Sequence, residues 1–260
     1  MLLDTWPNHA QMPERTWAAH YFGYLESRLL DLGITRLERV TSCQRIKDWR
    51  LSDPQCRHFS PLLDPARRDE REIDRRLISI AAMAGNRMVA VYSALSYPMI
   101  EGLREAVRLK RFPYDRPDQW HPEETITCPP EMPNISGLVI GWFLGFWVDP
   151  DWRSGRDGGG IGPLMNELIR IGALMAEPRM AHQVGVIPHA PKTPWLFWQD
   201  GQDVAVVGRG CHTAYHGWHH YHPNEPLLGT AQLLMHTPST VIWQRARDYA
   251  LATHPVEMAA

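Results

Sequence analysis

One stretch constrains the fold of this 260-residue chain most, because it joins a long apolar run to an amphipathic pattern through a glycine-rich loop. The apolar run covers residues 137–148, as expected for a strand buried on both faces, and Pro150 ends it. Apolar side chains then recur at helical spacing from Leu164 to Met175, and Pro163 suits the first turn of that helix. A strand, a glycine loop and a helix in this order can bring backbone N–H groups and a helix N-terminus to a phosphate.

The rest of the chain predicts a mixed α/β (α+β) fold with a central mixed sheet flanked by helices, not a regular βαβ array. Before the central stretch, the expected elements are a helix at 13–32, a strand at 34–40, a short helix ending at Trp49 and a hairpin with strands near 77–84 and 87–97. After it, they are strands at 182–187, from Val204 to Val207 and at 227–236, a short helix at 192–199 and a C-terminal helix at 239–252.

These elements predict three segments: an N-terminal helical extension at 1–33, a main domain at 34–236 and a C-terminal helix at 237–260. Residues 98–133 of the main domain are expected to be an insertion whose first part is helical. Its second part carries too many prolines for regular structure, so an active-site lid and a passive surface loop both stay open. The charge-dense segment 64–76 mixes both signs and is expected to be a solvated helix face.

Composition limits the partners of the chain. The net charge is -2 and the pI about 6.7, so nucleic acid is not indicated, although this composition does not exclude it. The run at 137–148 is shorter than the roughly 20 residues of a membrane helix. The N-terminus does not resemble a signal peptide, and the four scattered cysteines form no CxxC pair. We therefore expect a cytoplasmic protein that does not bind membranes. A homodimer stays open.

The central stretch resembles the GNAT acyltransferase superfamily, in which a Val-x-Pro strand end is followed by an Arg/Gly loop and a helix. The matching residues are Val148-Asp149-Pro150, then Arg153 or Arg156, then Gly158-Gly159-Gly160-Ile161-Gly162. The loop is a few residues longer than is usual in the family, so either arginine can take the motif position. A merely flexible glycine loop is the alternative. A Rossmann fingerprint and a Walker loop both fit less well, because Pro163 replaces the third glycine of the first and the second needs Gly-Lys-Ser/Thr.

This resemblance implies an acyltransferase that moves an acyl group, with acetyl as the first candidate, directly from acyl-CoA to an amine of a small molecule or a peptide. The residues that it places at the acyl-CoA are Phe146, Val148, Arg153, Arg156, Gly158, Gly159, Gly160, Ile161 and Gly162. The family's catalytic Tyr falls on Phe197 or Trp198 here, so another residue must act as general acid. His189, Tyr215 and His216 are the candidates for proton transfer.

A second interpretation uses the histidines of segment 212–222, namely His212, His216, His219, His220 and His222. Imidazoles bind zinc or iron well, and this cluster would make the chain a metal-binding or non-catalytic protein on a GNAT-like scaffold. The histidines follow no standard metal-ligand spacing, and a polar, aromatic strand edge explains them more simply. We therefore assign no metal ligand from the sequence.

Overall fold

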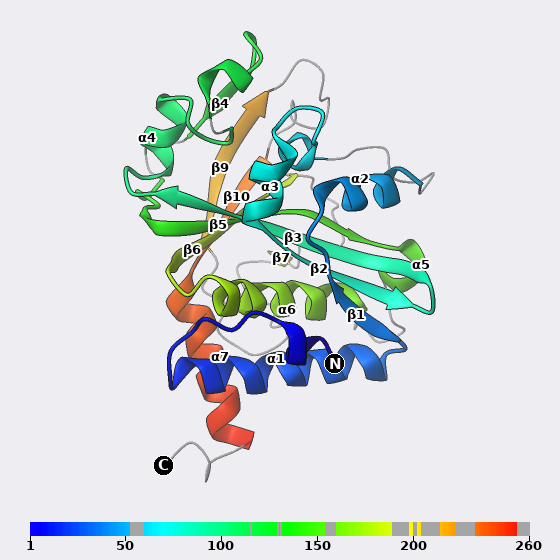
Figure 1. Ribbon diagram of the computed structural model, residues 1–260. Helices are drawn as coiled ribbons and strands as arrows, with labels where there is room; N and C mark the ends of the chain where they lie inside the picture. The colour runs from blue at the N-terminus through cyan, green and yellow to red at the C-terminus, as the bar shows by residue number, and fades with distance from the viewer. Residues whose placement is uncertain are drawn as a thin grey trace.

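The computed structural model describes residues 1–52, 60–114, 116–128, 130, 132–153, 160–188, 198–199, 202–203, 214–221 and 232–253. It confirms the mixed α/β class, with a central sheet that has helices on both faces (Figure 1). Across this eight-stranded sheet the order is β1 (Arg36–Arg39), β2 (Leu77–Ala84), β3 (Arg87–Met99), β5 (Gly137–Val148), β6 (Met180–Pro188), β10 (Gln232–Pro238), β9 (Ala214–Tyr221) and β4 (Thr125–Thr127). The β5–β6 pair is parallel and the other pairs are antiparallel.

The helices are α1 (Glu14–Asp31), α2 (Cys43–Ser52), α3 (Glu70–Arg76), α4 (Leu103–Arg108), α5 (Pro150–Arg153), α6 (Ile161–Ala176) and α7 (Ser239–Thr253). Short 3-10 turns lie at η1 (Leu2–Thr5), η2 (Pro61–Leu63) and η3 (Pro117–Gln119). Helix α6 makes the crossover between the parallel strands β5 and β6. The predicted hairpin at Gly85-Asn86, the strand at 137–148 and the helix after it are all confirmed.

One face of the sheet is covered by two layers of helix, because α6 packs on the strands and α1 and α7 pack on α6 (Figure 1). Phe22 and Leu25 of α1 are fully buried in the same cluster as Leu168 of α6. The Trp6 indole N–H also donates to the Gly172 carbonyl of α6 at 2.9 Å. The N-terminal segment therefore contributes to the core of the domain.

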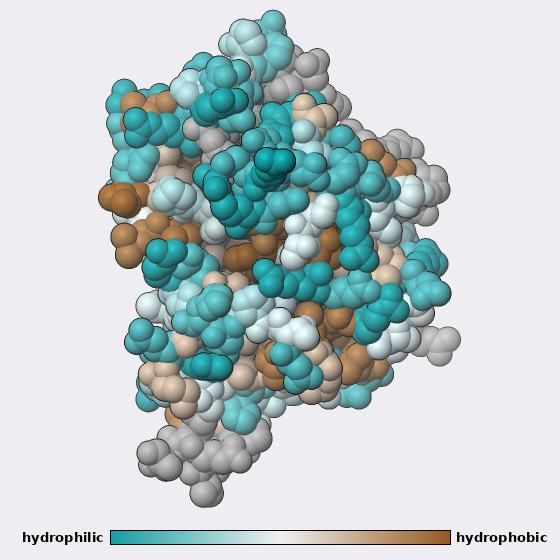
Figure 2. All heavy atoms as spheres, viewed as in Figure 1, coloured by the Kyte–Doolittle hydropathy of each residue, from teal (hydrophilic) through white to brown (hydrophobic). Residues whose placement is uncertain are grey.

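The other face carries α2, α3 and the segment 98–133 over a second buried cluster. Hydrophilic side chains gather over α3 on the outer surface (Figure 2), and only Ile73 of this helix is buried. The expectation of a solvated helix within 64–76 is therefore confirmed for residues 70–76. Among the described residues, no helix is both long and apolar enough to cross a membrane.

Two predictions of local structure were wrong. The second part of the insertion forms η3 and β4, although we expected no regular structure there. Residues 125–127 lie between the prolines, so their N–H groups can join a strand ladder with β9. Residues 198–199 were expected to end a short helix, but they form β7, which pairs with β8 (Gln202–Asp203). The sequence between β7 and β8 is Asp200-Gly201, which favours a tight hairpin.

Candidate functional site

The parallel strands β5 and β6 diverge part of the way along the sheet. Their pairing extends from Val139↔Met180 to Phe143↔Gly185, and β5 then continues to Val148. Beyond Phe143, no strand in the described part of the chain pairs with β5 on the side of β6, whereas β3 still pairs with its other edge. In the described part of the chain, this side of residues 144–148 has no strand partner, although the Gly145 and Val148 carbonyls accept hydrogen bonds from Arg50 and Arg153. The remaining backbone groups on this side can bind an extended ligand as another strand would.

A β-bulge marks the start of the free part of β5. Val91 pairs with Trp147 while Ser93 pairs with Leu144, so β5 contains one residue more than β3 between these pairs. Gly145 lies in the bulge with a φ of 66°, and its carbonyl accepts a hydrogen bond from Arg50 at 3.2 Å. The bulge changes the direction of the β5 backbone groups at the mouth of the fork.

Replacing Gly145 with Ala should destabilise the protein by about 1–3 kcal/mol. Alanine would have to adopt the positive φ of this position, which is unfavourable for any residue with a Cβ, and its Cβ would lie 2.9 Å from Leu63 Cδ1. Gly85→Ala is the matched control: Gly85 has a φ of 60°, but no atom lies within 4 Å of its added Cβ. Urea unfolding of both variants measures the difference. If both variants lose the same free energy of unfolding, packing against Leu63 does not limit the residue at the bulge.

The N-terminus of α6 lies beside the end of β5. An added Cβ at Gly162 would meet Phe146 Cζ at 3.6 Å and Val148 Cγ2 at 3.9 Å, so the first helical turn packs against both of these predicted site residues. Gly160 is the N-cap residue and provides no side-chain cap, and the first turn carries no acidic residue. The first turn of α6 therefore contains no negative side chain that would compete with a bound anion for the positive end of the helix dipole.

Gly160 is required for the way in which α5 and α6 meet. A Cβ at this position would lie 2.3 Å from the Arg153 carbonyl oxygen, which is backbone and cannot move aside easily. Ile161 is buried, at 2% exposed, and Phe146 is 40% exposed. Of these residues, Phe146 thus presents an accessible surface at the fork, whereas Ile161 contributes its backbone.

Arg153 has a local structural contact in addition to its predicted role. Its Nε donates to the Val148 carbonyl at 2.7 Å, which fixes the guanidinium at the end of β5. The Arg153 side chain is exposed, and the Arg153 backbone carbonyl lies beside Gly160 at the start of α6. A contact of Arg153 with phosphate stays a prediction.

The described site thus brings together Phe146, Val148, Arg153, Gly160, Ile161 and Gly162 of the predicted set. Arg156, Gly158, Gly159 and His189 lie outside the described residues. Tyr215 and His216 are placed by their backbone alone, in β9 opposite Met235 and Leu234 of β10. Their roles, and that of His189, stay predictions.

The structure gives one histidine of segment 212–222 a clear partner, which the sequence did not predict. His220 Nε2 donates to Glu124 Oε1 at 2.6 Å, and the Tyr114 hydroxyl donates to the same oxygen at 3.1 Å. The His121 N–H donates to the other carboxylate oxygen at 3.2 Å. Burial raises the pKa of Glu124, but these hydrogen bonds, that of His220 first, outweigh burial and hold the pKa below its usual value.

This network joins the insertion to β9, because Tyr114, His121 and Glu124 come from the insertion and His220 from the strand. Glu124 is 2% exposed and His220 is 5% exposed. His219, the neighbouring member of the histidine segment, is exposed. In the described part of 212–222, the observed role of a histidine is therefore to hold the insertion.

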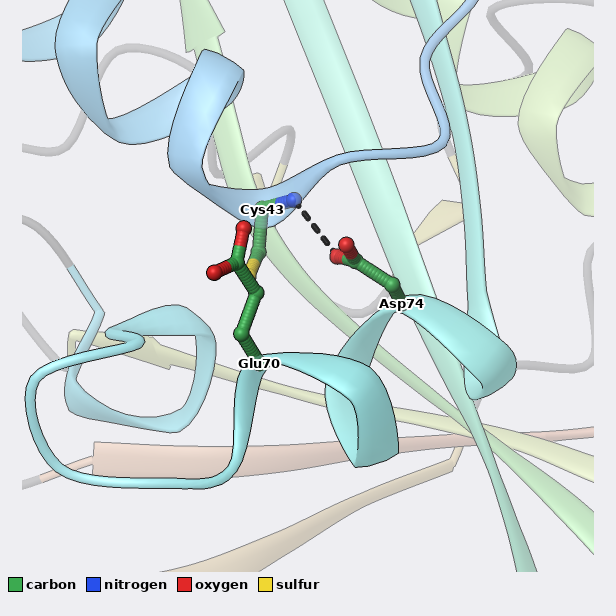
Figure 3. Close-up of side chains that lie close together, drawn as sticks. All are labelled: Cys43, Glu70 and Asp74. Atoms are coloured by element: carbon green, nitrogen blue, oxygen red, sulfur yellow. Dashed lines mark hydrogen bonds between the residues drawn. The ribbon is translucent and has the colours of Figure 1, made fainter.

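Cys43, Glu70 and Asp74 form another cluster, with one potential ligand atom of each within 4.8 Å of the others (Figure 3). Asp74 accepts a hydrogen bond from the Cys43 N–H at 2.8 Å and so caps the first turn of α2. Burial, and then a thiol hydrogen bond to Asp74, raise the pKa of Cys43 to about 12. The thiol therefore stays protonated at neutral pH, which disfavours it as a nucleophile or a metal ligand.

Comparisons with known proteins add little to this geometry. No family model matches the chain, and no curated protein matches it. Among solved structures, an uncharacterized protein from Bacillus halodurans is similar over 83% of this chain and 90% of that chain, with 11% identity and a TM-score of 0.40. A likeness at this level carries no functional argument, so the function must be argued from the residues.

Proposed function

We propose that this protein is an acyl-CoA-dependent N-acyltransferase that moves an acyl group, with acetyl as the first candidate, directly to an amine. The fork between β5 and β6 is the observation that carries the proposal. A ligand with amides along its length can bind to the free edge of β5, and its phosphates can reach the uncapped N-terminus of α6. The arrangement of strand, bulge, uncapped helix and parallel strand supports the resemblance to GNAT acyltransferases.

The residues present are compatible with acyl-CoA. Phe146 and Val148 would hold the pantetheine arm, and the first N–H groups of α6, with Gly160 and Gly162, would hold the pyrophosphate. Arg153 could contribute its remaining N–H groups, and Arg156, Gly158 and Gly159 belong to the same predicted loop. Acyl-CoA would supply an activated thioester, which is the chemistry that the protein itself lacks.

The transfer requires no covalent enzyme intermediate. The amine nitrogen forms a bond to the thioester carbonyl carbon, the C–S bond breaks, and the sulfur leaves as a thiolate that takes a proton. The amine gives its own proton to a base or to water, and His189, Tyr215 and His216 are the predicted groups for these proton transfers. Cys43 is not proposed as an acyl carrier, because its thiol is buried and protonated.

Calorimetric titration with acetyl-CoA and with longer acyl-CoAs tests this proposal. We expect a dissociation constant between about 1 μM and 1 mM for at least one of them, which is the ordinary range for enzyme substrates. Free CoA should compete for the same site. If no acyl-CoA binds, the acyltransferase proposal is wrong.

A further inference from the structure

Two buried polar residues lie beneath the fork, where the Gln183 side chain contacts the backbone of Arg170 in α6. Gln183 of β6 pairs with Gly141 of β5, shortly before the two strands diverge. Its side chain turns toward α6, where Nε2 donates to the Arg170 carbonyl at 2.8 Å. Gln183 is 1% exposed and Arg170 is 6% exposed, so both lie in the interior between helix and sheet.

Both residues carry a buried polar atom with an unmet hydrogen bond. Gln183 Oε1 and Arg170 Nε have no hydrogen-bond partner within the described parts of the chain. Across these same parts, no carboxylate forms an ion pair with Arg170, and the nearby Glu167 is bound to Arg245 at 2.7 Å. Because a buried donor, acceptor or charge without a partner is costly, these atoms require an explanation such as a ligand.

The Arg170 charge acts on Tyr92, which belongs to a group of aromatic side chains at the fork. Burial raises the pKa of Tyr92 to about 12, and Arg170 opposes that rise. The Tyr92 ring lies 5.8 Å from that of Phe143 and 4.6 Å from that of Phe146, measured between centroids. Phe143 makes the last β5 pair before the fork, and Phe146 is exposed just beyond it.

We infer that Arg170 and Gln183 form a subsite for a secondary amide of an extended ligand that enters the fork. An amide presents one carbonyl and one N–H, which match the Arg170 Nε–H and the Gln183 Oε1, both without a partner among the described residues. A phosphate or carboxylate would satisfy Arg170 but would leave the Gln183 oxygen facing another acceptor. The inference rests on the proposed function, in which the amides belong to the pantetheine arm of CoA.

Arg170→Met and Gln183→Met test this subsite by titration with CoA, pantetheine and 3′,5′-ADP. Pantetheine has the amides of CoA without the phosphates, and 3′,5′-ADP has phosphates without those amides. Each variant should weaken the binding of CoA and of pantetheine about 10-fold and leave the affinity for 3′,5′-ADP unchanged. Arg179→Met is the matched control, because Arg179 is exposed and pairs with Glu177 on the surface. It should change none of the three affinities.

Thermal unfolding without ligand separates a ligand subsite from a purely structural role. Arg170 has no carboxylate partner in the described part of the chain, so removing its buried charge should leave the Tm of Arg170→Met unchanged or raise it, whereas loss of a structural contact would lower it. Arg170→Gln, a smaller change, repeats the test if the Met variant does not fold.

Variants that bind CoA and pantetheine like wild type would overturn the subsite and leave the proposed function intact. A wild-type protein that binds no CoA would overturn both.

Discussion

Gly162→Asp should weaken CoA binding at least about 100-fold while the protein stays folded. The new carboxylate would lie in the first turn of α6, where it repels a bound pyrophosphate and competes for the same N–H groups. The same charge favours the helix itself, because acidic groups stabilise helix N-termini. The added Cβ has ordinary contacts of 3.6 and 3.9 Å, so packing permits it. Loss of binding would therefore report on the ligand and not on the fold.

Gly162→Asn is the matched control, since it has nearly the same shape without the charge. We expect Gly162→Asn to lose much less affinity than Gly162→Asp, and both variants to keep a Tm close to that of wild type. Titration calorimetry and thermal unfolding measure the two quantities. If Gly162→Asp binds CoA as tightly as Gly162→Asn does, the α6 N-terminus does not hold the phosphates.

Glu124→Ala is expected to lower the free energy of unfolding by about 3–5 kcal/mol. The substitution removes the acceptor of three donors in the interior, namely His220 Nε2, the Tyr114 hydroxyl and the His121 N–H. It also leaves a cavity where the carboxylate was 2% exposed. Chemical denaturation measures the loss. A change within about 0.5 kcal/mol, as is typical of surface positions, would contradict a structural role of the network.

Glu124→Gln tests the charge of the same group through pH. Folding lowers the pKa of Glu124. The ionised carboxylate therefore contributes its full stabilisation above the ordinary pKa of 4.5, and this stabilisation is lost as the pH falls through the lower pKa of the folded state. The stability difference between wild type and Glu124→Gln should therefore shrink as the pH falls below about 4.5. A difference that stays constant across this range would mean that the Glu124 charge contributes no stability.

The elements that the sequence predicted well are those whose signals are local. Each of these signals lies within one short segment of the chain. Examples are the apolar run at 137–148, the periodic residues of α6 and the Gly85-Asn86 turn. The same holds for the charge-dense helix α3. By contrast, the insertion was misread because its prolines dominate the composition, although three residues free of proline are enough to pair with β9.

The geometry of the candidate site depends on contacts between distant parts of the chain, which no local pattern contains. Glu124 and His220 are 96 positions apart, and the sequence singled out His220 without indicating its partner. The fork arises from the different directions that β5 and β6 take after Phe143 and Gly185. The unmet hydrogen bonds of Arg170 and Gln183 became visible only once helix and strand were packed together. Their polar character within otherwise apolar segments was the one signal that could have suggested them.

The pairing of β4 with β9 has a consequence for the behaviour of this protein at high concentration. Strand β4 occupies the outer side of residues 219–221, so their N–H and C=O groups are not a free sheet edge. An uncovered edge is a template on which a strand of another molecule can add, and such addition leads to aggregation. The Glu124–His220 bond holds the protecting strand in place. Strand β4 becomes the edge of the sheet in place of residues 219–221, and with three residues it offers a strand of another molecule only a short template.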